Sequence, residues 1–217
     1  MMANTSASAG SSIQRNTTAF AIGAFVWLAI IAVIIVDLVW GLTHDNYSYV
    51  TDTISDLAAG SNSMTMDVAM KVFSFAIMLL SFGLYHLGRE HDVSSNRWLI
   101  GCAILVPLAI AIYFIASFDA YSNDTSSRAL TIHRWLTYGL AAGFPLICFL
   151  MSRGIGKFSK AFARYSQIAG VLWIITAPIF MFLPTGYDGL YERMLAAQLL
   201  IWFGGAAWLL IRQDQAT

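Results

Sequence analysis

Four ionisable side chains in this sequence have the types and positions that acid–base chemistry needs. His133 stands at the start of an apolar stretch, Asp119 follows the end of another, and Arg193 precedes a third. A carboxylate that accepts a hydrogen bond from an imidazole sets its tautomer, so Asp56 or Asp119 would form a general acid–base pair with His133. Arg193 would neutralise the remaining carboxylate. Ser55, next to Asp56, is the candidate nucleophile, although no strand–turn–helix elbow surrounds it.

Three of these residues could instead bind a metal ion. Asp56, Asp119 and His133 would supply the mixed oxygen and nitrogen ligands that suit zinc, although no two of them have the spacing of ligands on one helix. Haem is disfavoured because the four histidines do not form facing pairs on neighbouring stretches. Cys102 and Cys148 lack metal-ligand spacing, and we expect both to be packing residues. The sequence therefore specifies no cofactor.

The segment that carries Asp56 is the longest polar insertion between two apolar stretches. It covers residues 44–63 and contains three aspartates but no lysine or arginine. Ile54 and Leu57 are three positions apart, which places them on one face of a helix. We therefore predict a short amphipathic helix over residues 53–59 that caps the end of a bundle and turns Asp56 inward.

The elements that must position these residues are long and apolar. The chain of 217 residues is 58% hydrophobic and 11% charged, and its mean hydropathy is +0.67, which excludes a soluble domain. A stretch such as residues 19–42 can cross roughly 30 Å of hydrocarbon at about 1.5 Å per residue. In lipid, only helices and closed barrels satisfy every peptide group, and these stretches do not alternate as barrel strands do. We predict an all-α polytopic membrane bundle of six transmembrane helices within residues 19–212, between short tails at 1–18 and 213–217.

The basic residues are distributed unevenly between the two ends of this bundle. Eight of the 12 fall in the tails, in the loops after the second and fourth stretches, or at the end of the sixth: Arg15, Arg89, Arg97, Arg153, Lys157, Lys160, Arg164 and Arg212. The positive-inside rule therefore predicts cytoplasmic termini in a multi-pass protein of the cell membrane. The candidate site would then lie at the extracytoplasmic mouth.

Two charged residues lie inside the first two apolar stretches. Asp37 and Lys71 fall at similar depths from the outer end, and an unpaired charge in hydrocarbon costs on the order of 3 kcal/mol on insertion scales. We predict a structural ion pair between them. The alternative is that Lys71 extends its ammonium group outward to the membrane surface.

Several short motifs lie at the ends of the apolar stretches. They are residues 54–60 (ISDLAAG) after the first stretch, Phe118 and Asp119 after the third, His133 at the start of the fourth, and residues 189–193 (GLYER) before the sixth, at 194–211. This layout resembles the bacterial and archaeal membrane proteins of domain-of-unknown-function family 998, which are similar in layout to the DRAM/Sfk type. The resemblance implies six helices with an external polar cluster. It implies no reaction, because the family lacks an assigned one.

Two classes of function fit these residues. One is an enzyme that acts on a lipid, an isoprenoid or another apolar small molecule by acid–base or metal-assisted chemistry. The other is a non-catalytic lipid-binding or accessory subunit, in which the polar cluster is structural. Transport is disfavoured because the polar residues end before the middle of the membrane. We expect membrane lipids and an apolar small molecule as partners, and no nucleic acid, while the oligomeric state is left open.

Overall fold

The computed structural model describes residues 17–43, 47–58, 64–118, 128–180, 182 and 186–212. The described residues form helices joined by turns and contain no strand, so the predicted all-α class is confirmed. The predicted tails lie outside the described residues except for Thr17 and Thr18, which begin the first helix.

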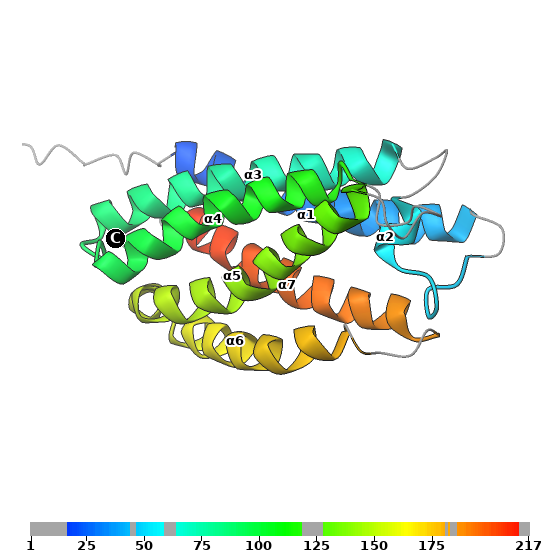
Figure 1. The fold of residues 1–217 in the computed structure, drawn as a ribbon. Coiled ribbons are helices and arrows are strands. Elements are labelled where there is room, and N and C mark those ends of the chain that lie inside the picture. The colour runs from blue at the N-terminus through cyan, green and yellow to red at the C-terminus, as the bar shows by residue number, and fades with distance from the viewer. Residues whose placement is uncertain are drawn as a thin grey trace, which may run out of the picture.

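Six long helices and one short helix make up the described chain. In order, they are α1 (Thr17–Thr43), α2 (Ile54–Leu57), α3 (Met64–Glu90), α4 (Asn96–Ile115), α5 (Arg128–Phe158), α6 (Lys160–Phe180) and α7 (Asp188–Arg212). The long helices run back and forth along a common direction, with α3 and α4 along one edge and α6 along the opposite edge (Figure 1). The short helix α2 contacts α1 and α7 at one end of the bundle.

Five of these helices are long and apolar enough to cross a membrane: α1, α3, α4, α5 and α7. Large apolar side chains cover their outer faces, such as Leu28 on α1 and Ile201 on α7, which are 64% and 58% exposed. Such a surface suits hydrocarbon rather than water. The remaining long helix, α6, carries the cations Lys160 and Arg164 near its start. The structure therefore supports a multi-spanning membrane protein, while the number of six spans stays a prediction.

The start of α1 packs directly against the end of α7. A Cβ atom added at Gly23 would lie only 2.7 Å from the carbonyl oxygen of Ala207 and equally close to the Ile211 side chain. Only glycine permits this approach of the two backbones. The two ends of the described chain consequently lie at the same end of the bundle (Figure 1).

Buried hydroxyl groups connect the helices inside the core. Ser81 donates a hydrogen bond of 2.7 Å to the carbonyl of Cys102, and Ser166 donates one of 2.9 Å to the carbonyl of Cys148. The indole of Trp202 donates in turn to the Ser166 hydroxyl at 2.9 Å. Interhelical bonds of this kind each contribute about 0.6–2 kcal/mol in a bilayer. Both cysteines are buried and free, which confirms their predicted role as packing residues.

The last helix begins earlier than predicted. We expected the sixth stretch to begin at residue 194, but α7 begins at Asp188. Gly186 takes a φ of +124°, which favours glycine, and its N–H donates to the Asp188 carboxylate at 3.2 Å. This turn ends the connection and starts the helix. Glu192 and Arg193 therefore lie within the first two turns of α7.

Candidate functional site

Arg193 forms the closest ion pair of the described residues at the α2 end of the bundle. Its Nε lies 3.1 Å from Oδ2 of Asp37, and its Nη2 lies 2.8 Å from Oδ1. The two side chains are only 15% and 13% exposed. This two-point contact matches the planar guanidinium to the planar carboxylate, which makes it stronger than a single charged hydrogen bond. It joins α1 to α7 across 156 positions of the sequence.

The predicted pair between Asp37 and Lys71 is therefore wrong. The Lys71 ammonium lies 5.8 Å from the centre of the Tyr113 ring on α4. Both residues lie near the same end of the bundle, as their depths predict. The depth of a residue along its helix, however, does not determine which neighbouring helix its side chain faces. Lys71 lies on the face of α3 toward α4, whereas Asp37 lies where α1 meets α7.

The remaining donors of Arg193 hold the segment after α1. Its Nη1 donates to the carbonyls of Tyr49 at 3.1 Å, Asp52 at 2.8 Å and Gly189 at 3.1 Å, while Nη2 also donates to the Tyr47 hydroxyl. The guanidinium lies 5.6 Å and 5.0 Å from the ring centres of Tyr47 and Tyr49. All five N–H groups of the side chain thus have acceptors. We call Arg193, Asp37, Tyr47 and the carbonyls of Tyr49 and Asp52 the Arg193 cluster.

The segment 47–53 also packs closely on the two helices. The Tyr49 hydroxyl donates to the carbonyl of Leu38 on α1 at 2.5 Å. A Cβ atom added at Gly189 would lie 2.2 Å from the carbonyl oxygen of Asp52, so α7 touches the backbone of the segment at this point. The N–H of Leu190 donates to the carbonyl of Val50 at 3.1 Å. The segment is therefore held by backbone contacts as well as by Arg193.

Tyr47 remains a neutral phenol inside the cluster. Burial raises its pKa to about 12, although the hydrogen bond from Arg193 and the positive charge of that residue act in the opposite direction. The protonated hydroxyl donates to the carbonyl of Thr53 at 3.1 Å while it accepts from Arg193. The cluster is consequently neutral overall, with one positive and one negative side chain.

Glu192 holds the start of the short helix. Its carboxylate accepts from the backbone N–H groups of Ile54 at 2.5 Å and Ser55 at 3.4 Å, and from the Ser55 hydroxyl at 3.0 Å. These N–H groups have no partner within a helix, so an external carboxylate satisfies them. The candidate nucleophile Ser55 therefore donates to a carboxylate, and no imidazole contacts it within the described part of the chain.

Asp56 satisfies the other donors at the start of α2. Its carboxylate accepts from the N–H of Thr53 at 2.6 Å and from the Thr53 hydroxyl at 2.7 Å, while the same hydroxyl accepts from the N–H of Asp56. Thr53 and Asp56 thus form a capping box. The predicted short helix is confirmed, although it is limited to Ile54–Leu57. Its last residue, Leu57, is buried. The predicted last residue, Ala59, lies outside the described residues.

His133 lies apart from this group. Its Nδ1 is 2.9 Å from the carbonyl oxygen of Phe118, just beyond the end of α4. The helix that carries it, α5, packs mainly against α4 and α6 rather than against α1, α2 and α7. Asp119 lies outside the described residues. Asp56 and Arg193 thus contact adjacent residues of one segment, whereas His133 contacts Phe118, and the predicted cluster of these three residues with Asp119 stays a prediction.

The structure does not test the zinc prediction fully, because Asp119 was one of its ligands. Within the described ranges, no three His, Cys, Asp or Glu side chains come together in a way that could hold a metal ion. The Asp56 carboxylate already accepts two hydrogen bonds from Thr53. Zinc binding through Asp119 and His133 stays a prediction.

The family model described as "Protein of unknown function (DUF998)" matches residues 18–209. The chain belongs to this family. The resemblance of the short motifs to this family is thus confirmed. No curated protein and no solved structure matches the chain. The matched region contains the complete Arg193 cluster and every long helix of the DUF998 chain up to the last turn of α7.

Two contributors to the cluster escaped the sequence analysis of this DUF998 protein. Tyr47 and Tyr49 alternate along the segment after α1, a spacing that places both on one side of an extended chain. Their only sequence signal is this spacing within an acidic segment. Glu192 lies in the motif of residues 189–193, but its position next to Arg193 does not indicate that the two side chains bind different parts of one segment.

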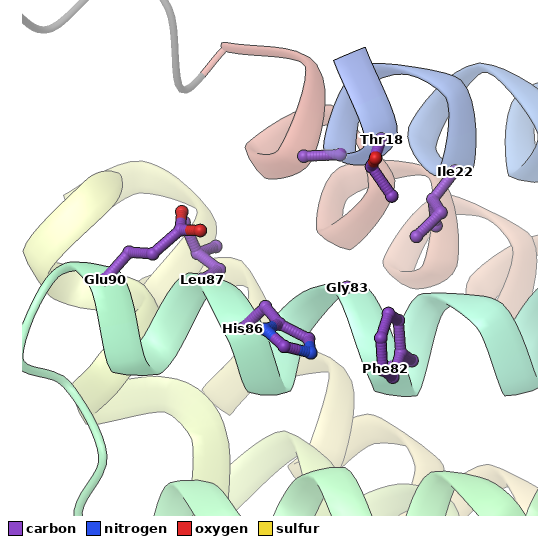
Figure 2. A pocket seen from close by; sticks show the side chains of 8 residues that line it. Thr18, Ile22, Phe82, Gly83, His86, Leu87 and Glu90 are labelled. Atoms are coloured by element: carbon purple, nitrogen blue, oxygen red, sulfur yellow. The ribbon is translucent and has the colours of Figure 1, made fainter. Parts of the chain in front are cut away.

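Two surface grooves formed by described residues of the DUF998 chain include no predicted catalytic residue. The first, of about 250 Å³, lies at the end of the bundle that holds both chain ends. Figure 2 shows Thr18 and Ile22 of α1 facing Phe82, His86 and Glu90 of α3 across it. The second, of about 260 Å³, lies between α3 and α4 and includes Lys71.

Proposed function

We propose that this DUF998 protein is a non-catalytic, lipid-binding membrane protein in which the Arg193 cluster has a structural role. The observation that carries the structural role of the cluster is the saturation of Arg193, whose five N–H groups all have acceptors inside the protein. The exposed apolar faces of the long helices support the binding of lipid. An arginine that binds a substrate needs at least one donor directed at that substrate. Glu192 and Asp56 likewise accept from the start of α2.

The location of the cluster gives a physical reason for this role. The segment 47–58 must return across the end of an apolar bundle, where unsatisfied peptide groups are costly. Arg193 and Glu192 supply donors and acceptors to that segment from two adjacent positions of α7. The segment would therefore be ordered whether or not a ligand is present.

The Asp37–Arg193 pair offers the test of this proposal. Asp37→Leu and Arg193→Met should each lower the stability of the purified protein by about 3 kcal/mol, because each leaves one charge without its partner. The double variant should regain a large part of that loss, since no unpaired charge remains. Thermal unfolding in detergent measures all three. Single variants that unfold like the wild type would show that the two charges are solvated and available to a substrate, and the structural role would be rejected.

We also propose six transmembrane spans with both termini in the cytoplasm of a cell-membrane protein. Gly23 at the start of α1 lies beside Ala207 near the end of α7, so the chain begins and ends on one side of the membrane and crosses it an even number of times. Five crossings would place the two ends on opposite sides, so α6 must cross as well. The end that holds the chain termini also holds most of the basic residues, which supports its cytoplasmic placement.

Cysteine labelling in intact cells tests this topology. Val50 is 42% exposed at the α2 end, and Ser94 is exposed at the other end. Val50→Cys should react with an impermeant maleimide, whereas Ser94→Cys should react only after the cells are opened. Cys102 and Cys148 are buried, so the unmodified protein provides a low background. Equal labelling of both variants before opening would exclude the proposed topology.

A second candidate function rests on His133. Its Nδ1–H can donate to the Phe118 carbonyl, which leaves Nε2 of the neutral ring as an acceptor. A general base for a lipid, isoprenoid or other apolar small molecule needs that arrangement. Membrane lipids incubated with the reconstituted wild type and with His133→Asn distinguish the two functions. A new lipid product formed by the wild type alone would favour the enzyme.

A further inference from the structure

The groove between α3 and α4 takes no part in the Arg193 cluster or in the surroundings of His133. Seven residues line it: Lys71, Ser74, Phe75, Met78, Ile110, Tyr113 and Phe114. Its apolar members are strongly exposed, with Phe75 at 54% and Ile110 at 44%. A groove of this kind on a membrane-spanning bundle lies against hydrocarbon.

Lys71 gives the groove a charged end. It follows the start of α3 by seven positions, or about 10 Å along the axis. Within the described ranges, no carboxylate lies within ion-pair distance of its ammonium, which lies 5.8 Å from the centre of the Tyr113 ring. A cation–π contact only partly offsets the cost of a charge near hydrocarbon. An anion from outside the protein would offset the rest.

The rest of the groove is apolar and extends from this charge along the helices. Phe75 and Met78 follow Lys71 by four and seven positions, so the three side chains share one face of α3. Ser74, at the back, is buried and donates to the carbonyl of Ala109 at 2.6 Å. The polar group at the back is therefore satisfied, and the remaining lining suits an alkyl chain.

We propose that this groove binds one anionic phospholipid of the surrounding leaflet. Its phosphate would contact the Lys71 ammonium, and an acyl chain would lie along Phe75, Met78 and Ile110. The inference rests on the proposed lipid-binding function and names the lipid class and its site. The charge complementarity of Lys71 selects a lipid with a net negative head group over a zwitterionic one.

Native mass spectrometry of the full chain in detergent, titrated with phosphatidylglycerol or phosphatidylcholine, tests the site. The wild type should bind one phosphatidylglycerol more tightly than phosphatidylcholine. Lys71→Met should weaken phosphatidylglycerol binding about five-fold, whereas Lys71→Arg, which keeps the positive charge, should bind as the wild type does. Arg134 is exposed near the same end of the bundle, so Arg134→Met removes an equal charge and should leave the affinity unchanged.

A variant of the apolar wall of the groove distinguishes the contribution of the acyl chain to binding from that of the head group. Met78→Trp fills the groove and should weaken both lipids. Equal loss in Lys71→Met and Arg134→Met would overturn the site, because attraction would then depend only on net charge. Displacement of the lipid by inorganic phosphate would also overturn it in favour of a plain anion site. Lipid binding that no groove variant alters would reject the site but leave the lipid-binding function intact, whereas lipid turnover would reject that function.

Discussion

Arg193 and Lys71 are cations that enter the apolar bundle near the same end, yet their surroundings are opposite. Arg193 is surrounded by Asp37, two tyrosine rings and three carbonyls, and every donor is used. Lys71 lines a groove between α3 and α4, where its ammonium lies 5.8 Å from the centre of the Tyr113 ring. The difference shows that two cations at similar depths in a bundle can have unlike surroundings. The unused donors of each cation decide whether it can bind something else.

The largest contrast in stability should be between Arg193→Lys and Lys71→Arg. Arg193→Lys keeps the charge but loses the two-point contact with Asp37 and the bonds to the segment carbonyls, so we expect a loss of about 2 kcal/mol. Lys71→Arg should change stability by less than about 0.5 kcal/mol, because Lys71 has no hydrogen-bond or ion-pair partner among the residues that the structure describes. Thermal unfolding of both variants in one detergent measures the contrast. Similar midpoints for the two variants would remove the distinction drawn between the cations.

A smaller effect should come from the glycine beside the cluster. Gly189→Ala places a methyl group 2.2 Å from the Asp52 carbonyl oxygen, so the segment must move and we expect a loss of about 1.5 kcal/mol. Gly139→Ala is the matched control on α5, since nothing lies within 4 Å of the added atom. That control should be neutral or gain up to about 1 kcal/mol from helix propensity. Proteolysis of the 47–58 segment should rise only in Gly189→Ala, and an unchanged digestion pattern would argue against close packing there.

The smallest effect should be a pH dependence from Tyr47. The phenol has its pKa raised by burial from about 10 when unfolded to about 12 when folded, so it favours the folded state while protonated. This contribution is complete below pH 10 and is lost as the pH rises toward 12. Because the ring is half-buried, solvent screening limits the effect to on the order of 1 kcal/mol.

Unfolding midpoints of the wild type and Tyr47→Phe between pH 8 and 11.5 measure this contribution. The stability difference between them should shrink above pH 10. Tyr187→Phe, at an exposed position, is the control and should show a difference that does not change with pH. A difference between the wild type and Tyr47→Phe that stays constant across this range would show that the phenol is not held in its protonated form.

The amino-acid sequence by itself determined the helical membrane class and the short helix after α1. Long apolar stretches leave the helix as the way to satisfy their peptide groups, and this requirement is local to each stretch. The capping box is local as well, because Thr53 and Asp56 are three positions apart and need no other element. The free, buried cysteines also follow from composition and spacing. These features depend on neighbours in the sequence.

The tertiary structure alone decided which polar groups meet. Asp37 pairs with Arg193 because α1 packs against α7, and an apolar pattern does not encode the neighbours of a helix. His133 contacts the Phe118 carbonyl for the same reason, since α5 packs against α4 and α6. The sequence locates charges by their depth along a helix, but their partners depend on the direction each helix face takes in the bundle. Packing therefore pairs Arg193 with Asp37 and places Lys71 in a groove between α3 and α4, although both are cations at one end of the same bundle.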